Sequence, residues 1–574
     1  MTRLGETVRV MREAQSERNI SARIRGSIQK RSDLPPTTFA IAVEGKHRLD
    51  REKIEREIEN IHQVVAKAID LFDGDQNWAL ILFPGVTVAD LPYPPFDFAY
   101  DLAQRFDLHT SEPAIPSTFY PEEPNHKIGI RSVDDISGTC WTPEEDAADL
   151  DPHWATKRIK APEAWAYSSA QGRPAKGAGI SVFQPDTGVV GHYDANGTLR
   201  LHRELENSSI DLSRAADIID QDPLPIDPAD YGWSSGHGTG TASVVVSREA
   251  NAMVGAAPAA TLVPVRCVMF VAQLDLTSVA MAVDHARRQP DAHIITMSLG
   301  GLYSRALQRA IARAIDDNIL VMAAAGNCVG FVVHPAALPE CIAVAGTTHE
   351  DAAWRGSCSG PEVDWSAPAE FVQRASAAGG SLVNVGLGQG TSFAVALSAG
   401  AAAAWLAHYG RDELIKSLRK QETLQDRFRA IAQRTADPHT VCDPGRFGAG
   451  ILNVRSLLEN GGPKARLPRI ATGVAQSVED TTRSVRAQAA QAAALFGGSV
   501  TASIPHKNPT FDWELHAMEV SWLIYTRMLR ERAAASARLA GAQTVRARKV
   551  EVSDRLSAAI RSSRDPTLRS LLGA

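Results

Sequence analysis

Between about Trp154 and Leu458 the sequence alternates short runs of apolar, mostly β-branched residues with segments of helical periodicity. The short runs are apolar along their whole length, as strands are when both faces of their sheet are covered. Such strands separated by helices predict an α/β fold with a doubly wound, mostly parallel sheet. The predicted strands span 179–184, 262–268, 293–298, 319–325 and 341–346, and the predicted helices span 237–248, 275–288, 303–316 and 392–408.

Different kinds of sequence flank this unit. Residues 1–36 are polar, and residues 37–125 predict a small α/β domain, with strands at 38–44 and 78–84 on either side of an amphipathic helix from Arg51 to Phe72. A further helix is expected at 94–107. Residues 461–574 are rich in Ala and Arg and predict a basic helical extension, since they hold 17 Lys and Arg against 9 Asp and Glu.

The overall composition is that of a soluble globular protein. The chain has 44% apolar and 22% charged residues and a net charge of −6, so nothing global points to nucleic acid or a membrane. The first twenty residues lack the apolar core of a signal peptide, and the longest run of small apolar residues, Ala394 to Ala407, is too short to span a bilayer. We therefore expect a cytoplasmic protein.

The six cysteines lie far apart, with no C-x-x-C pair, which favours free thiols over disulfides and argues against a zinc site. They are Cys140, Cys267, Cys328, Cys341, Cys358 and Cys442.

Four short motifs carry groups that could perform acyl transfer. Ser392, after Gly390 and Thr391, opens an Ala-rich helix, where backbone N–H groups favour negative charge. His237 lies between glycines at the start of another helix, and Asp186 and Asn327 each follow a predicted strand. Each motif alone has an ordinary explanation as a helix cap or a turn.

Taken together, the four motifs resemble the subtilisin family, the subtilases, in which Asp, His, the oxyanion Asn and Ser occur in this order. The resemblance covers about residues 151–460 and implies a subtilisin-like fold and a serine endopeptidase. It implies that Asp186 orients His237, that His237 is the general base for Ser392, and that Asn327 stabilises the oxyanion. It also implies that substrate is bound by Ser298, Leu299, Gly300, Gly301, Ala325, Gly326 and Val333.

The sequence departs from the family pattern at two informative places. Ala396 stands where the family usually has Pro, and Val333 stands where a glycine commonly forms the base of the specificity pocket. A branched side chain at that base predicts a shallow pocket for small or medium side chains.

Other interpretations of the catalytic unit remain open at the level of sequence. The fold could serve as a catalytically silent binding module, or the same triad could belong to an esterase or a peptide ligase. No cofactor is expected. Calcium is an alternative, because the insert between Asp186 and His237 is acidic. A solvated acidic loop is favoured, since the sequence shows no ligand loop of fixed spacing. The acidic residues of the insert are Asp217, Asp220, Asp222, Asp227 and Asp230.

The flanking regions predict partners as well as domains. Residues 37–125 fit either a prodomain, which would be cleaved between about Pro113 and Trp154, or an unrelated accessory domain. The extension has a net charge of +8 and the remainder −14, so we expect its basic helices to dock on the acidic body, on another copy or on a protein partner, apart from catalysis. Nucleic acid is a less favoured partner because few aromatic residues lie among the Arg residues. The expected substrate is a protein or peptide.

Overall fold

The computed structural model describes residues 39–62, 64–86, 95–115, 140–142, 147, 150–229, 234–249, 251–273, 275–441, 443–465, 482–495, 511–539, 552–563 and 565–572. The polar segment 1–36, Asp230 and Cys442 therefore lie outside the described residues. The five described cysteines form no disulfide with one another, as the sequence predicted.

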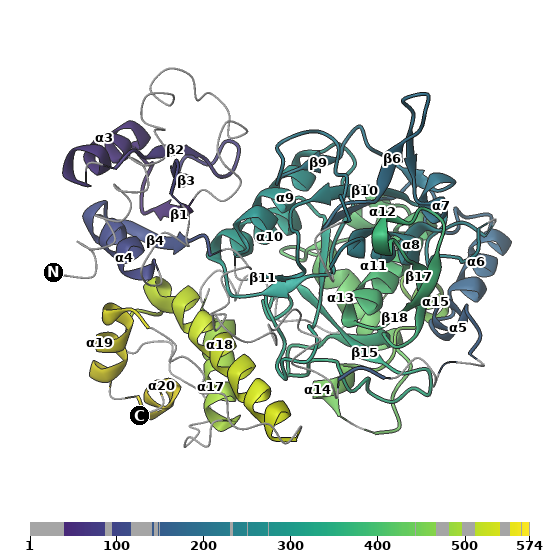
Figure 1. Ribbon diagram of the computed structural model, residues 1–574. Coiled ribbons are helices and arrows are strands. Elements are labelled where there is room, and N and C mark those ends of the chain that lie inside the picture. The colour runs from purple at the N-terminus through teal and green to yellow at the C-terminus, as the bar shows by residue number, and fades with distance from the viewer. Residues whose placement is uncertain are drawn as a thin grey trace.

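A parallel sheet forms the centre of the largest unit (Figure 1). Seven strands follow one another in the order β16-β15-β14-β12-β5-β10-β8, every neighbouring pair is parallel, and the short β9 also pairs with β10. This confirms the predicted fold class. The strands are β5 (Ser181–Asp186), β8 (Ser209–Ile210), β9 (Ala216–Asp217), β10 (Thr261–Arg266), β12 (Ile294–Met297), β14 (Leu320–Ala324), β15 (Ile342–Thr347) and β16 (Trp365–Pro368).

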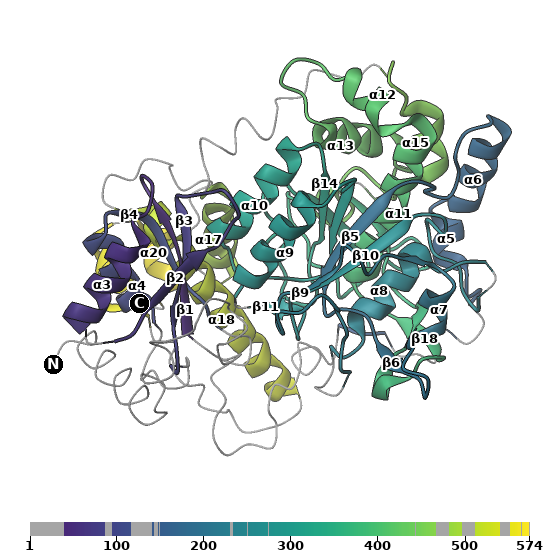
Figure 2. The same cartoon turned by 90° about the horizontal axis from the view of Figure 1, so that it is seen from above.

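Helices cover both faces of this sheet (Figure 2). On β12, Ile294 packs into the apolar cluster shared with α8 (His237–Val246) and α11 (Thr391–Tyr409), whereas Ile295 packs into the cluster shared with α9 (Thr277–Arg288) and α10 (Arg305–Asp316). Because successive side chains of a strand point to opposite faces, both must be apolar here, which explains the continuous apolar runs in the sequence.

Smaller elements complete this unit. They are α5 (Trp154–Arg158), α6 (Ala161–Ala170), β6 (Gly191–Tyr193), β7 (Leu199–Leu201), α7 (Arg203–Glu206), β11 (Ala272–Gln273), β13 (Gly300–Gly301), β17 (Val372–Ala375), β18 (Val385–Gly388), α12 (Arg411–Lys416), α13 (Leu424–Thr435), α14 (Pro444–Phe447) and α15 (Val454–Asn460).

The helix α11 runs through the middle of the protein. It has 19 residues, more than the run Ala394 to Ala407, and with these flanking residues it is apolar enough, by length and composition alone, to cross a membrane. Its apolar window is 100% buried inside the protein, however, which identifies α11 as a core helix.

The N-terminal domain is an antiparallel sheet with strand order β2-β3-β1-β4, accompanied by two helices. Its elements are β1 (Phe39–Gly45), α3 (Arg51–His62), β2 (Lys67–Asp70), β3 (Trp78–Phe83), α4 (Phe96–Arg105) and β4 (Leu108–Pro113). The predicted helix from Arg51 to Phe72 is correct only in its first half. Beyond His62 the chain turns back, and β2 pairs with β3, an interaction that helical spacing of Ile residues cannot reveal.

The two faces of the small sheet have different partners. Ile41 and Ile81 face α3 and α4, whereas Trp78 and Leu80 belong to the same apolar cluster as α9 and α10 of the central unit. At the end of β4, the carboxylate of Glu112 accepts hydrogen bonds from Ser304 Oγ (3.0 Å) and from the first backbone N–H of α10, that of Arg305 (2.7 Å). The N-terminal domain is thus docked on α10.

The C-terminal extension is helical, as predicted, and packs beside both other units (Figure 1). Its helices are α17 (Arg483–Leu495), α18 (Trp513–Leu539), α19 (Asp554–Ser562) and α20 (Pro566–Leu571). The docking differs from the expected attraction of basic helices to an acidic body. Buried apolar residues such as Leu523 and Ile524 carry it, and the ion pair that joins α18 to α10 has its acid, Glu514, on the extension and its base, Arg305, on the body.

Candidate active site

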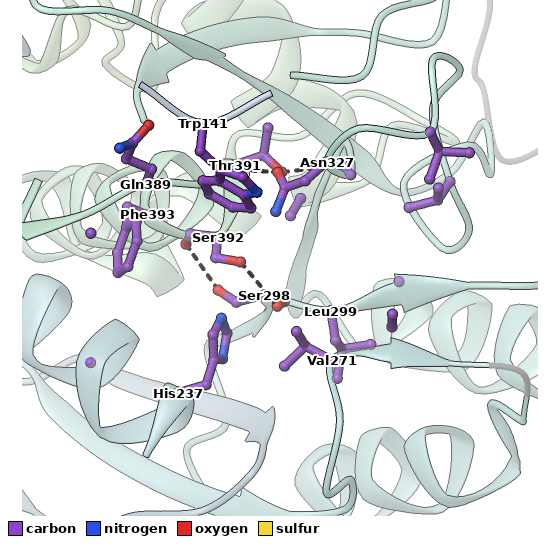
Figure 3. Close-up of a pocket in the computed structure, with 18 of the residues that line it drawn as sticks. Trp141, His237, Val271, Ser298, Leu299, Asn327, Gln389, Thr391, Ser392 and Phe393 are labelled. Carbon is purple, nitrogen blue, oxygen red and sulfur yellow. Dashed lines mark hydrogen bonds between the residues drawn. The ribbon is translucent and has the colours of Figure 1, made fainter. Parts of the chain in front are cut away.

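The predicted catalytic residues converge at the carboxyl ends of the parallel strands. Asp186 ends β5, Ser298 follows β12 and Asn327 lies shortly after β14, while His237 and Ser392 stand in the first turns of α8 and α11. All but the buried Asp186 line one cavity of about 510 Å³ (Figure 3). Open α/β sheets bind ligands at this edge because the strand ends and helix N-termini meet there.

The base and its orienting carboxylate are in direct contact. His237 Nδ1 lies 2.8 Å from Asp186 Oδ1, and the carboxylate is fully buried. The same carboxylate also accepts the backbone N–H of Thr187 at 2.7 Å. Gly238 is required beside the histidine because a Cβ there would stand 2.2 Å from the carbonyl oxygen of Gly188. The imidazole is therefore held through Nδ1, which leaves Nε2 for the cavity.

The hydroxyl of Ser392 points to a different acceptor. Ser392 Oγ donates to the carbonyl oxygen of Ser298 at 3.3 Å, and Ser298 Oγ donates to the carbonyl oxygen of Ser392 at 3.0 Å. Among the described residues no hydrogen bond joins Ser392 to His237, although both side chains project into the same cavity (Figure 3). Hydrogen bonds between a nucleophile and its base are often long or poorly aligned without substrate and tighten when substrate is bound.

The amide of Asn327 is oriented by the residue before the serine. Its Oδ1 accepts hydrogen bonds from the backbone N–H (3.0 Å) and the hydroxyl (2.8 Å) of Thr391, so that Nδ2 is turned away from Thr391. A Cβ on Gly390 would stand 3.3 Å from this Nδ2 and 3.8 Å from Ser392 Oγ. The amide donor and the N-terminus of α11 thus face the same space, where both would stabilise a negative oxygen.

Five of the seven predicted substrate-binding residues line the cavity, namely Ser298, Leu299, Gly300, Gly326 and Val333. Gly301 and Ala325 are buried beside it and do not line it. The side chain of Val333 fills the space between two glycines, because its Cγ2 lies 2.5 Å from a Cβ placed on Gly300 and 2.7 Å from one placed on Gly326.

Two lining residues come from outside the central unit and had no signal in the sequence. Trp141 belongs to the segment before this unit, and Tyr525 belongs to α18 of the extension. Thr142, the residue after Trp141, is fixed at the cavity edge by Gln389. Gln389 Oε1 accepts the backbone N–H of Thr142 (3.0 Å), and Gln389 Nε2 donates to the carbonyl oxygen of Thr142 (2.6 Å). The extension thus contributes Tyr525 to the cavity wall, and its separation from catalysis stays a prediction.

The carboxylates of the acidic insert are engaged by protein donors. Asp217 and Asp220 both pair with Arg266, and Asp227 accepts the backbone N–H groups of Ala229 (2.9 Å) and Gly236 (2.8 Å). In the part of the chain that the structure describes, no group of three or more His, Cys, Asp or Glu side chains could hold a metal ion. The described residues of the insert, which do not include Asp230, therefore form no cluster of carboxylates suited to calcium.

Comparison with known proteins places this geometry in context. A family model described as "Subtilase family" matches residues 177–450, which include the four catalytic candidates. Subtilisin-like protease 1 of Trichophyton rubrum is 31% identical over 268 residues, 45% of this chain and 47% of that protein. Thermitase of Thermoactinomyces vulgaris is 29% identical over 231 residues, 39% of this chain and 74% of that protein.

The chain spans about half the length of the first of these relatives. Among solved structures, that of MycP1 with the N-terminal propeptide removed is similar at 21% identity and a TM-score of 0.42, and the match covers 54% of this chain and 98% of that one.

Proposed function

Residues 177–450 form a subtilase domain, and from this premise we propose that the protein is a serine endopeptidase that hydrolyses peptide bonds through Asp186, His237 and Ser392. The observation that carries the proposal is that His237, held by the buried Asp186, lines one cavity with a serine at the N-terminus of α11. Structural serines at helix starts are common, so the proposal depends on the cavity that Ser392 shares with a histidine held by a buried carboxylate.

The proposed chemistry follows from the placement of these groups. Ser392 Oγ attacks the peptide carbonyl while His237 takes its proton, and the carbonyl electrons move to an oxyanion that Asn327 Nδ2 and the helix N-terminus stabilise. The C–N bond then breaks, and the amine leaves with the proton from His237. Water, deprotonated by His237, releases the acyl group and restores the serine. Asp186 stabilises the imidazolium and keeps its orientation.

A second proposal concerns the side chain that precedes the scissile bond. Val333 occupies the space between Gly300 and Gly326, both of which line the cavity, so we expect small or medium side chains to be preferred. A misfit of one or two carbons in such a pocket is worth about 1–3 kcal/mol. Cleavage of a peptide library would test this preference, and efficient cleavage after Phe or Tyr would contradict it.

The catalytic proposal is tested by labelling with a fluorophosphonate and by digestion of casein, with an ester substrate in parallel. Ser392→Ala should abolish labelling and lower turnover by about 10⁶, the magnitude found in subtilisin itself. Asn327→Ala should keep the nucleophile and lower turnover by a factor of about 10²–10³, again the magnitude found in subtilisin.

Ser398→Ala is the matched control, because this serine is also buried on α11 but donates to Ala394, accepts the indole N–H of Trp365 and is not among the residues that line the cavity. It should label and digest casein like the wild-type protein. Labelling that survives in Ser392→Ala would overturn the assignment of the nucleophile. A wild-type protein that neither labels nor hydrolyses would favour the silent binding module, and one that cleaves esters but not casein would favour the esterase.

A further inference from the structure

The cavity around Ser392 has an apolar side that is assembled from distant parts of the chain. Val271, Leu299, Val329 and Val333 line it together with Tyr525 of α18. Figure 3 shows Leu299 and Val271 on one side of Ser392, with Gln389 and Phe393 on the other. Tyr525 is only 4% exposed and belongs to the same buried apolar cluster as Leu299, Val329 and Val333.

The face of α18 that carries Tyr525 is anchored to the central unit. Ser521 Oγ accepts the backbone N–H of Tyr303 at 3.0 Å, close to the strand β13 that begins at Gly300. Ser521 and Tyr525 are four residues apart and so lie on the same side of the helix. This hydrogen bond is buried and fixes the position of Tyr525 relative to β13.

The N-terminal domain also holds α18. The rings of Trp522 and Phe96 lie 5.9 Å apart between centroids, and Tyr100 donates a hydrogen bond of 2.7 Å to Glu519. The helix therefore lies between the two other units, and its position does not depend on surface charge alone.

The neighbouring helix α17 holds the segment that bears Val333. Gln488 Nε2 donates to the carbonyl oxygen of Val332 at 2.7 Å, and Ser484 Oγ lies 3.0 Å from His334 Nε2. Both contacts are buried, and they flank Val333 on each side in the sequence. The extension thus supports the pocket wall from behind with α17 and supplies part of it with α18.

From these contacts we infer that Tyr525 is a specificity-determining residue: its ring closes the apolar side of the pocket and limits the size of the substrate side chain bound there. The inference rests on the proposed peptidase function and adds to it a role for the C-terminal extension. Truncating the ring leaves space that a larger substrate side chain can fill, and such filling is worth about 1–3 kcal/mol, a factor of about 10–200.

The test compares peptides that differ only in Ala, Leu or Phe before the scissile bond. In Tyr525→Ala the kcat/KM ratio of the Phe peptide to the Ala peptide should rise at least about tenfold over wild type. Tyr525→Phe, which keeps the ring, should keep the wild-type ratio. Ile524→Ala is the matched control, because Ile524 is equally buried on α18 but is not among the residues that line the cavity. It should also keep the wild-type ratio.

A binding experiment separates this inference from the catalytic proposal. On the Ser392→Ala background, the Kd ratio of the same peptides should shift with Tyr525→Ala as the kcat/KM ratio does, whether or not the wild-type protein is a peptidase. An unchanged ratio in a folded Tyr525→Ala protein, in both measurements, would overturn the inference. If that variant does not fold, Tyr525→Leu keeps apolar contact and should shift the ratios in the same direction. A folded Tyr525→Leu protein with wild-type ratios would overturn it equally.

Discussion

The stability of the C-terminal extension should depend on pH through one buried carboxyl group. Glu519 of α18 accepts hydrogen bonds from Tyr100 Oη and from the backbone N–H and hydroxyl of Ser553, each at 2.7 Å. In the part of the chain that the structure describes, it forms no salt bridge. Burial, which disfavours the charged form, raises the pKa of Glu519 to about 7 from its ordinary value of 4.5.

The sign and size of the effect follow from this difference in pKa. Below pH 4.5 the group is protonated in both the folded and the unfolded chain. Between pH 4.5 and about 7 only the folded protein keeps the proton, so the free energy of unfolding falls as the pH rises through this window. Each pKa unit corresponds to about 1.4 kcal/mol, so the total loss is about 3 kcal/mol, complete above pH 7.

Glu519→Gln should remove this dependence, because the amide stays neutral; its oxygen can accept the backbone N–H of Ser553, and its NH2 can donate to the hydroxyls of Tyr100 and Ser553. Denaturant unfolding of both proteins, on the Ser392→Ala background to prevent self-cleavage, would be followed by tryptophan fluorescence at pH 5 and pH 8. Relative to its parent, the Gln variant should be more stable at pH 8 than at pH 5 by about 3 kcal/mol. Parallel pH profiles of the two proteins would refute the reasoning, since Glu519 would then have the same pKa folded and unfolded.

Two further predictions concern the oxyanion site and the N-terminal domain. Thr391→Val removes one of the two donors that hold the Asn327 amide, so steady-state kinetics should show kcat about tenfold lower with little change in KM. This loss should be smaller than that of Asn327→Ala. An equal loss of kcat in both variants would mean that the hydroxyl alone orients the amide. Wild-type protein should cleave itself between about residues 113 and 154, whereas Ser392→Ala should stay intact; absence of any fragment in active enzyme would favour an accessory domain. The N-terminal fragment should co-elute with the remainder in gel filtration, because Glu112 and the apolar face of its sheet stay docked. A fragment that elutes alone would contradict the docking.

Much of the central unit can be predicted because its signals are local. Strands covered on both faces must be apolar throughout, as at Ile294 and Ile295. Glycines near the predicted helix starts indicate the positions of His237 and Ser392. The order of the four motifs then indicates the family, since strand ends of a parallel sheet meet at one edge. β16 was not predicted because Trp365–Pro368 has no β-branched residue and pairs with β15, which lies earlier in the chain.

Long-range packing decided the rest. The second half of the helix predicted from Arg51 contains β2 instead, because this segment pairs with the edge of β3. The spacing of apolar residues in the sequence does not reveal such a pairing. The hydroxyl of Ser392 donates to the carbonyl oxygen of Ser298, which stands 94 residues earlier in the chain. Above all, the sequence by itself predicted the helices that the described parts of residues 461–574 contain and their basic charge, whereas only the tertiary structure decided that Tyr525 lines the cavity. The physical reason is that helical periodicity specifies which residues share a face, but the surface that buries that face is chosen by complementary shape and hydrogen bonds elsewhere in the fold.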